Sequence, residues 1–459
     1  MVTDSPPTDP HSHPSTPPKW ISSAAHAYSD RTPGSRERWK RACDLLPLGV
    51  SGSGKFFDPH PLFIASARAS RVVDVDGHEY VDLLMGNASL LLGHAHPRIV
   101  AAVAEQAARF SGATMPYDLG LALAERICRA NHLDRIRLTV TGSEACRSAL
   151  RVARAATGRH RFAKCEGGYH GSDDAFLVSG HTRNLAGPDN QPSPVLDYAG
   201  LPPGAADDVV VLPYNDAGLA EEIVARHASE LAAVIIEPIA FSAGGAIQGT
   251  AEFLGTLRRV TQAAGIVLIF DEVVTGYRLG PGGAAERYGI TPDLVTLGKG
   301  IAGGMPLGAF GGRAQLMDLA LAGPPERRIF QSGTYVENAI SVAAAHAVLD
   351  ELHARPDAIA IMDELGARLR NGMAAEFDRA GLTSSVTGSA SLAHFHLGAS
   401  RVTNRRDLLA SDLELTRLAQ LALVAGGVLW LPLHPAALSV VHTQHDIETV
   451  LAVLRHMLR

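Results

Sequence analysis

The chain has 459 residues, of which 46% are hydrophobic and 19% charged, and its formal net charge is −6. This length allows two or three domains with a large core, while the acidic balance and the lack of a basic run exclude a typical nucleic-acid-binding protein. No apolar stretch is long enough to span a bilayer, so we expect no membrane association.

The four cysteines and the N-terminal residues indicate in which cellular compartment the protein is expected. The cysteines have neither metal-binding nor disulfide spacing, and the first residues lack the basic and apolar regions of a signal peptide. We therefore expect a cytoplasmic protein. His94 and His96 form an H-x-H pair without accompanying carboxylates or cysteines, and we expect no metal site there.

The N-terminal quarter divides into three stretches. Residues 1–33 are rich in Pro, Ser, Thr and His and are predicted to form a disordered arm. A helix is expected from Arg36 to Leu46, followed by a Gly/Ser loop through Lys55. Asp76-Gly77 lies between the apolar runs 71–75 and 79–82, which predicts a hairpin. Residues 34–95 would form the N-terminal segment of a small domain.

From about residue 96, helical patterns alternate with short apolar strands. Strands are predicted at 137–140, 209–212, 233–236 and 266–270. This alternation is typical of an α/β fold with a mostly parallel sheet covered by helices. A long helix, 339–352, then leads into a smaller α+β region. We expect a large domain over 96–340 and the C-terminal part of the small domain over 341–459.

Two residues at predicted strand ends carry the chemistry. Asp271 follows the run 266–270, and Lys299 follows the run 293–297. Ligands of such sheets bind beyond the carboxyl ends of the strands. A lysine amine can form a Schiff base with pyridoxal phosphate (PLP), and a carboxylate can keep the pyridine nitrogen protonated. Gly298 to Gly303 also matches the dinucleotide motif G-x-G-x-x-G, but no acidic residue follows at the ribose-binding distance and Pro306 interrupts the expected helix.

Further residues could hold such a cofactor. Gly142 and Ser143 open a predicted helix, where free N–H groups bind phosphate, although Ser143 could equally be a plain helix cap. Tyr169 stands between glycines and could stack on a flat ring or serve a purely structural role. Glu237 ends another strand, and Thr334 precedes a helix and offers a second phosphate donor.

These motifs resemble those of the class III, fold-type I, PLP-dependent aminotransferases, most of all the glutamate-1-semialdehyde aminomutase branch. The resemblance covers nearly everything from Leu46 onward. It is carried by Gly142-Ser143-Glu144-Ala145, Glu166 to Gly171, Tyr214-Asn215-Asp216, Ile236-Glu237-Pro238, Asp271 to Arg278, Leu297-Gly298-Lys299, Gly303 to Gly312 and Gln331 to Thr334. It implies a large domain with a seven-stranded sheet and a small domain made of both ends of the chain.

The resemblance also implies residue roles. Lys299 would be the Schiff-base lysine and the catalytic base, and Asp271 would pair with the pyridinium nitrogen. Val273 and Tyr169 would pack on the two faces of the cofactor ring. The phosphate would be held by Gly142, by Ser143 and, from the neighbouring subunit, by Thr334. A homodimer with shared active sites would then be the functional unit.

Several positions depart from the family pattern. Gly86-Asn87 replaces a Ser-Trp pair of the aminomutases, and Lys55 lies in the loop where a carboxylate-binding arginine is usual. Lysine lacks the bidentate fork of arginine. Ser242 replaces an asparagine, and Glu337 adds a carboxylate near the expected pocket. We therefore treat Lys55, Asn87, Glu237, Ser242 and Glu337 as substrate-binding candidates. Glu337 could instead only cap its helix.

These departures favour a polar or cationic acceptor such as an oxidised amino sugar, in secondary metabolism such as the biosynthesis of aminoglycoside antibiotics. The leading prediction is a PLP-dependent aminotransferase acting on a small-molecule amine and carbonyl pair. The alternatives are an aminomutase or epimerase using the same residues, a β-amino-acid aminotransferase, and a cofactor-bearing protein without activity. Arg278 is expected to form a structural ion pair rather than bind substrate.

Overall fold

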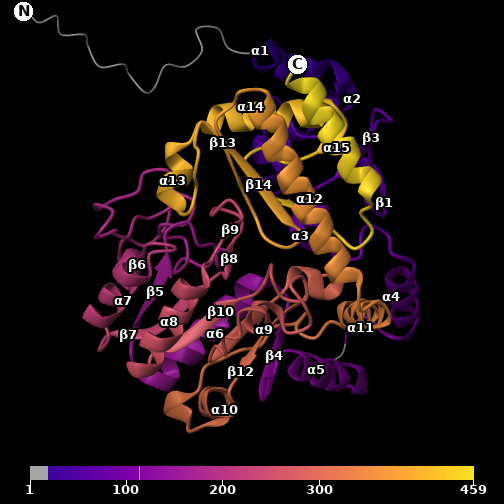
Figure 1. The fold of residues 1–459 in the computed structure, drawn as a ribbon. Coiled ribbons are helices and arrows are strands. Elements are labelled where there is room, and N and C mark those ends of the chain that lie inside the picture. Colours follow the sequence, from indigo (N-terminus) through magenta and orange to yellow (C-terminus); the bar gives the residue numbers. More distant parts are fainter. Residues whose placement is uncertain (1–18, 113) are drawn as a thin grey trace, which may run out of the picture.

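The computed structural model describes residues 19–112 and 114–459. Of the predicted disordered arm, residues 1–18 lie outside this part of the chain. The prediction is wrong for the remainder, because helix α1 (Lys19–Arg31) forms and packs on helix α14 (Leu413–Ala425) (Figure 1). Tyr28 on α1 is buried and its hydroxyl donates a hydrogen bond of 2.9 Å to the carbonyl of His60. A distant helix thus supplies the apolar partner that the local sequence does not reveal.

A seven-stranded sheet forms the centre of the molecule, in the order β4-β12-β11-β10-β7-β5-β6. Its strands are β4 (Arg135–Thr139), β5 (Arg161–Cys165), β6 (Val209–Leu212), β7 (Leu231–Ile236), β10 (Val267–Asp271), β11 (Leu294–Leu297) and β12 (Gly308–Gly312). Only β12 runs antiparallel to both neighbours within this sheet. The predicted α/β class with a mostly parallel sheet is therefore confirmed.

Strand β10 shows how the sheet is buried on both faces. All five of its residues are buried. Val267 and Ile269 belong to the apolar cluster beside helix α6 (Gly142–Thr157). Leu268 and Phe270 belong to the cluster beside helices α7 (Ala217–Arg226) and α8 (Ala251–Ala263). Because side chains alternate along a strand, Asp271 faces the same side as Val267 and Ile269. Its carboxylate is therefore directed toward α6.

Helices cover both faces of this sheet (Figure 1). They are α4 (Pro97–Arg109), α5 (Asp118–Ala130), α6 (Gly142–Thr157), α7 (Ala217–Arg226), α8 (Ala251–Ala263), α9 (Gly283–Tyr288), α10 (Ala314–Ala322) and α11 (Ala339–Ala354). Helices α6 and α10 pack on one another, as do α7 and α8, and α11 packs on α4 and α5. The helix expected to open at Gly142 and Ser143 is α6, and the helix expected at 339–352 is α11.

The two ends of the chain meet in a second, four-stranded sheet. It contains β1 (Ile64–Arg68), β2 (Arg71–Asp74), β3 (Glu79–Asp82) and β15 (Val428–Leu429). The predicted hairpin is confirmed, since Arg71 pairs with Val81 in antiparallel β2 and β3. Strand β15 lies parallel to β3, with Val428 opposite Val81. The domain boundaries at 33/34, 95/96 and 340/341 stay predictions.

The remaining elements complete the N-terminal and C-terminal regions. They are α2 (Pro33–Cys43), α3 (Met85–Ala88), β8 (Ile239–Ala240), β9 (Ile247–Gln248), α12 (Ala358–Arg379), β13 (Ser384–Thr387), β14 (Leu392–Leu397), α13 (Arg405–Ala410), β16 (Ala436–Ala437) and α15 (Gln444–Met457), with short 3-10 turns at 47–49, 53–55, 203–206, 299–302 and 325–327. Helix α2 begins and ends three residues before the helix expected at 36–46.

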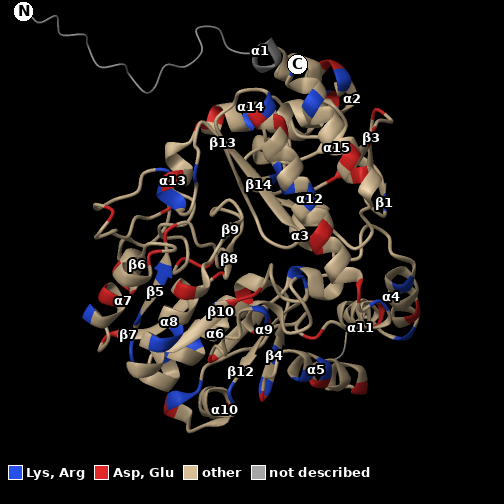
Figure 2. Ribbon diagram, in the orientation of Figure 1, with Lys and Arg blue, Asp and Glu red and all other residues tan. Residues whose placement is uncertain are grey.

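Charged residues of both signs are interspersed along the outer helices (Figure 2). Within the described residues, no helix combines the length and apolarity needed to cross a lipid bilayer.

Arg278 links three distant segments without the ion pair that the sequence suggested. Its side chain is buried and donates hydrogen bonds to the Ser391 hydroxyl (2.9 Å), the Leu438 carbonyl (2.6 Å) and the Ala88 carbonyl (2.9 Å). Burial lowers its pKa to about 10, so it still carries its charge at neutral pH. The prediction of an ion pair is wrong, because the guanidinium group donates to three uncharged acceptors, while its buried Nε has no partner among the described residues.

Replacing Arg278 with methionine is expected to lower the free energy of unfolding by about 3–5 kcal/mol, since an unsatisfied buried acceptor costs about 1–3 kcal/mol. The control is Arg287→Met. Arg287 pairs with Asp363 at 2.8 Å at the surface, and its loss should cost less than about 1 kcal/mol. Urea unfolding of both variants measures the difference, and equal midpoints would contradict a linking role for Arg278.

Candidate active site

A cavity of about 180 Å³ lies beyond the carboxyl ends of strands β7, β10 and β11. It is lined by Gly142, Ser143, Cys146, Tyr169, His170, Gly171, Glu237, Asp271, Val273, Val274 and Lys299. Asp271 is the last residue of β10, Glu237 directly follows β7, and Lys299 follows β11 after one glycine. The fold thus brings together seven of the predicted cofactor-binding and substrate-binding residues.

The Asp271 carboxylate is fixed from several sides. His170 Nδ1 lies 2.7 Å from one oxygen, and the other accepts hydrogen bonds from Thr296 (3.1 Å) and from the Val273 N–H (3.1 Å). Burial opposes the charge, but the hydrogen bonds, led by that from His170, hold the pKa of Asp271 below its ordinary value. Asp271 is therefore ionised and can pair with a protonated ring nitrogen.

His170 completes this arrangement, although it was not among the residues predicted from the sequence to act in the site. Burial lowers the pKa of its imidazole despite the adjacent Asp271, which favours the neutral ring. An ionised carboxylate only accepts, so we assign the proton to Nδ1. His170 Nε2 is buried and has no partner among the described residues. His170 therefore orients Asp271 as a neutral donor.

The amine of Lys299 lies in a setting that favours its neutral form. The residue is partly accessible through the cavity, yet burial lowers the pKa of the amine, while Glu237 and Asp271 oppose this shift. Its Nζ lies 5.4 Å from the centre of the Phe241 ring. The backbone at Lys299 has a φ of 47°, a strained conformation of the kind that clusters at functional sites. A neutral amine can act as a nucleophile or base.

The N-terminus of helix α6 closes one side of the cavity. A Cβ at Gly142 would approach both γ-carbons of Val273 to 2.8 Å, and one at Gly171, whose φ is 103°, would lie 2.4 Å from the Ser143 hydroxyl oxygen. Ser143 also accepts a hydrogen bond from the Ser172 N–H at 3.3 Å. Both glycines therefore allow close approach at a helix end where free N–H groups and the helix dipole favour a phosphate.

Glu237 positions the loops that carry two aromatic rings. Its carboxyl group accepts hydrogen bonds from the Tyr169 N–H (2.8 Å) and the Phe241 N–H (3.3 Å). Burial, reinforced by the negative charge of Asp271, raises the pKa of Glu237 to about 8. Glu237 is thus largely protonated at neutral pH. Its role is to bind the backbone N–H groups of Tyr169 and Phe241 rather than to place a negative charge in the cavity.

This pKa predicts how the Glu237→Gln variant responds to pH. A raised pKa in the folded state means that stability is lost as the pH rises from about 4.5 through about 8. Relative to the wild type, the variant should be about equally stable at pH 5 and more stable by about 4 kcal/mol at pH 8.5. Urea unfolding of the cofactor-free proteins measures this, with the exposed Glu252→Gln as control. A pH-independent difference would contradict the assignment.

Three of the predicted substrate-binding residues lie outside this cavity. Lys55 is exposed and its Nζ donates to the Ser51 hydroxyl at 3.1 Å. Asn87 is exposed, with a φ of 56°. Ser242 is half-buried and lines a second cavity. None of these three residues is among the described residues that line the cavity around Lys299.

Thr334 and Glu337 also lie apart from Lys299 within the chain. Thr334 is exposed, between Phe330 (81% exposed) and Tyr335 (69% exposed). Glu337 is half-buried and its carboxyl group lies so close to helix α5 that a Cβ on Gly120 would overlap it. Burial raises the pKa of Glu337.

Two further partners of Asp271 escaped the sequence analysis. Cys146 on α6 lies with its Sγ 3.4 Å from Asp271 Oδ2 and 3.4 Å from the Thr296 hydroxyl. Thr296 sits on neighbouring β11, opposite Asp271. The sequence offers only a weak signal for either, because both residues are ordinary members of a buried helix and strand. His170 had a better signal, since it adjoins Tyr169 within a glycine-flanked motif.

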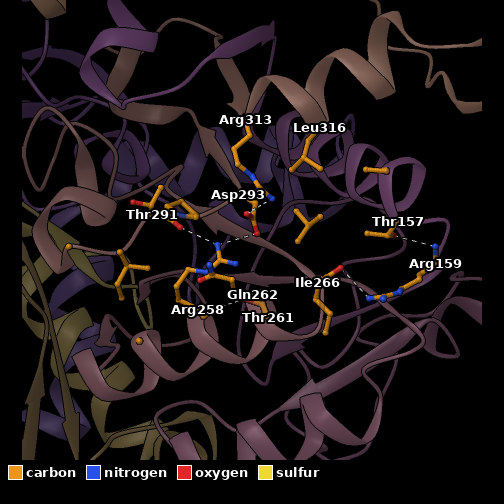
Figure 3. A pocket seen from close by; sticks show the side chains of 17 residues that line it. Thr157, Arg159, Arg258, Thr261, Gln262, Ile266, Thr291, Asp293, Arg313 and Leu316 are labelled. Carbon is orange, nitrogen blue, oxygen red and sulfur yellow. Dashed lines mark hydrogen bonds and ion pairs between the residues drawn. The ribbon is translucent and has the colours of Figure 1, made fainter.

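A larger cavity, of about 770 Å³, lies at the opposite, amino-terminal ends of β10 and β11. Figure 3 shows Arg258 and Arg313 directed at Asp293, which they approach to 3.1 and 2.6 Å. Arg159 donates to the carbonyls of Leu231, Ala264 and Gly265. Each arginine is thus committed to structural contacts, and this end of a parallel sheet is not where ligands bind. The smaller cavity is therefore the candidate active site.

The residues of the smaller cavity fit PLP. An ionised, buried Asp271 suits a pyridinium nitrogen, a lysine with a lowered pKa suits the aldehyde, and the α6 N-terminus suits the phosphate. Val273 and Tyr169 line the space between them.

Comparison with known proteins agrees with this chemistry. The profile of the family "Aminotransferase class-III" matches residues 55–458. A glutamate-1-semialdehyde 2,1-aminomutase of Rhodopirellula baltica is 39% identical over 360 residues, covering 77% of this chain and 79% of that protein. An omega-transaminase from Sphaerobacter thermophilus has a TM-score of 0.87 and 34% identity, covering 94% of this chain and 98% of its own. A beta-phenylalanine aminotransferase from Variovorax paradoxus has a TM-score of 0.85 and 33% identity, covering 95% of this chain and 96% of its own. The chain therefore belongs to the class-III aminotransferase family and is a PLP-dependent enzyme.

Proposed function

We propose that this enzyme moves an amino group at a carbonyl substrate, with Lys299 as the base that carries the proton. The observation that carries the proposal is the meeting of Lys299 and Asp271 in one cavity lined by Tyr169, Val273 and the α6 N-terminus. When bound, PLP supplies an electron sink for the charge left as a proton leaves the carbon beside the amine.

Each side chain in the cavity would have a separate role in the reaction. Lys299 takes a proton from one carbon and returns it to another, which its lowered pKa supports. Asp271 would stay ionised and pair with the ring nitrogen, and His170 and Thr296 hold its oxygens at 2.7 and 3.1 Å. Glu237 keeps the Tyr169 loop in place. Tyr169 and Val273 line the same cavity as Lys299 and would hold the cofactor ring there.

Two reactions use these same groups. The first candidate is an intramolecular amino shift, because the similar sequences include glutamate-1-semialdehyde 2,1-aminomutases at 37–39% identity. The second is transfer between two substrates, as by an omega-transaminase or a β-amino-acid aminotransferase. Lys55 does not separate the two reactions: it stands exposed, bonded to Ser51, in the loop where both the aminomutases and the β-amino-acid aminotransferases have an arginine.

Labelled glutamate 1-semialdehyde tests the first candidate. The PLP-loaded enzyme is incubated with the compound carrying ¹⁵N on its amino group. An aminomutase gives the amino-shifted isomer, which over many turnovers keeps the label on the neighbouring carbon, and it accumulates no deaminated product with two carbonyl groups. A transaminase instead bleaches the cofactor absorption with an amino donor and releases the matching keto compound in equal amount. Neither result, with a panel of donors and with the cofactor bound, would overturn the proposed function.

A homodimer in which Thr334 reaches the neighbouring phosphate is supported by the exposure of Phe330 and Tyr335 beside it. The amino-sugar acceptor, the antibiotic pathway and the cytoplasmic location stay predictions.

A further inference from the structure

The Asp271 carboxylate has two hydrogen-bonding partners on each of its oxygens. Oδ2 lies 2.7 Å from His170 Nδ1 and 3.4 Å from Cys146 Sγ. Oδ1 accepts hydrogen bonds from the Thr296 hydroxyl and from the Val273 N–H, both at 3.1 Å. An ionised carboxylate has about four lone-pair sites. Groups of the protein itself therefore fill all of the sites on Asp271.

A protonated ring nitrogen that pairs with Asp271 would bring a fifth donor. It would approach from the candidate active-site cavity, whose lining includes Asp271, Cys146 and His170. One of the four donors must then release its lone pair. The donor that does so should form a weak hydrogen bond and should have a second acceptor within reach, because a buried donor without any partner is costly.

Three of the four donors do not meet both conditions. The Val273 N–H belongs to the backbone of the turn after β10 and cannot rotate. His170 Nδ1 makes the shortest contact, at 2.7 Å, and the described residues offer it no second acceptor. The Thr296 hydroxyl has only the sulfur of Cys146 as an alternative, and a thiol sulfur is a weak acceptor.

Cys146 meets both conditions. A thiol is a weak donor, and its sulfur also lies 3.4 Å from the Thr296 hydroxyl oxygen. This oxygen can accept the S–H while its own hydrogen stays on Asp271. Both acceptors are equally far from one sulfur atom. An exchange between them therefore needs only a rotation of the thiol hydrogen about the Cβ–Sγ bond.

The surroundings of Cys146 keep its thiol protonated. The residue is 1% exposed on helix α6. Burial, reinforced by the negative charge of Asp271, raises the pKa of the thiol well above its ordinary value. At neutral pH the group is thus an S–H donor and not a thiolate, which excludes a role as a nucleophile.

We propose that Cys146 is a positioning residue that occupies Oδ2 of Asp271 and turns to Thr296 when the cofactor ring nitrogen takes its place. Asp271 is then fully hydrogen-bonded both before and after the cofactor binds, and the thiol keeps a partner in both states. The proposal goes beyond the proposed function and rests on it in one respect, which is the pairing of the ring nitrogen with Asp271.

The S–H stretching vibration reports this exchange, because it absorbs apart from the other groups of a protein. The infrared spectrum of the PLP-loaded enzyme minus that of the cofactor-free enzyme should lose one S–H band and gain one at higher wavenumber, since a hydroxyl is a weaker acceptor than a carboxylate. Cys146→Ala should show neither feature. Cys165 is the internal reference: it is buried on β5, outside the described lining of the cavity, and its band should not move.

A double-mutant cycle gives a second readout. Thr296→Val removes the alternative acceptor, so the S–H of Cys146 would stay on Asp271 and compete with the ring nitrogen. Adding Cys146→Ala should therefore improve the affinity for pyridoxamine phosphate more in this background than in the wild type, by about threefold or more, as expected for coupled neighbours. Cys165→Ala is the control and should have the same effect in both backgrounds. Equal effects of Cys146→Ala in the two backgrounds would contradict the exchange.

A cofactor analogue isolates the ring nitrogen. Deazapyridoxal phosphate has a C–H in place of this nitrogen and nearly the same shape, so it cannot donate to Asp271. It should bind without moving the Cys146 band. A band that stays fixed with PLP, or that moves equally with both compounds, would overturn the proposal. Attachment of PLP to Lys299 in the same preparation would leave the proposed function standing.

Discussion

Replacing Lys299 with alanine is expected to reduce turnover by at least about 10²–10⁴-fold, the contribution of a positioned base, and to prevent covalent attachment of the cofactor. The folded protein should not lose stability. Burial lowers the pKa of the Lys299 amine, so the cation is less favourable in the folded chain than in water, and its removal relieves that cost.

Borohydride reduction followed by peptide mass spectrometry tests this result. The wild type should carry the cofactor on the peptide that contains Lys299, and Lys299→Ala should carry none. Lys40→Ala is the control, because Lys40 is exposed on helix α2, and this variant should label and turn over like the wild type. Substantial turnover by Lys299→Ala, or labelling at another lysine, would contradict the role of Lys299.

Asp271→Asn is the second change with a large expected effect. The amide keeps the shape but cannot hold a proton on the ring nitrogen by charge, and turnover should fall by about 10²–10³-fold, as when one preorganised electrostatic group is lost. His170 would then face an amide rather than the carboxylate that it now approaches to 2.7 Å. Single-turnover rates with an amino donor measure the effect.

A charged cofactor analogue separates electrostatics from structural damage. In Asp271→Ala the shortened side chain leaves room for a methyl group on the ring nitrogen. PLP methylated at that nitrogen carries a fixed positive charge and should restore part of the lost rate, whereas it should not improve the wild type. No recovery, in a variant whose thermal midpoint is unchanged, would argue against a charge-based role for Asp271.

Local sequence was sufficient for the residues that follow buried strands. The run 266–270 predicts a strand and places Asp271 at its end, and β10 occupies Val267–Asp271. The same reasoning holds for Glu237 after β7 and Lys299 after β11. Parallel packing then brings their ends to one edge, which explains why the main cofactor-binding residues could be predicted together.

Contacts between distant segments could not be predicted in this way. Arg405 reaches the carbonyl of Ala243, 162 residues away, and His170 reaches Asp271 across 101 residues. Neither pairing leaves a periodic pattern. Helix α1 was missed for a related reason, since its burial depends on α14, nearly 400 residues later in the chain. Tertiary partners, rather than propensity, decide these elements.

The pairing of β3 with β15 has a consequence for biosynthesis. Val81 cannot meet Val428 until nearly the whole chain has been made. At about 5–20 residues per second, the roughly 350 intervening residues leave the N-terminal hairpin without this neighbour for about 20–70 s. By then all seven strands of the central sheet, which end at Gly312, have been synthesised. On the ribosome, the edge of β3 would be open to other chains during that interval, so expression at low temperature or with a chaperone should improve the yield of folded enzyme.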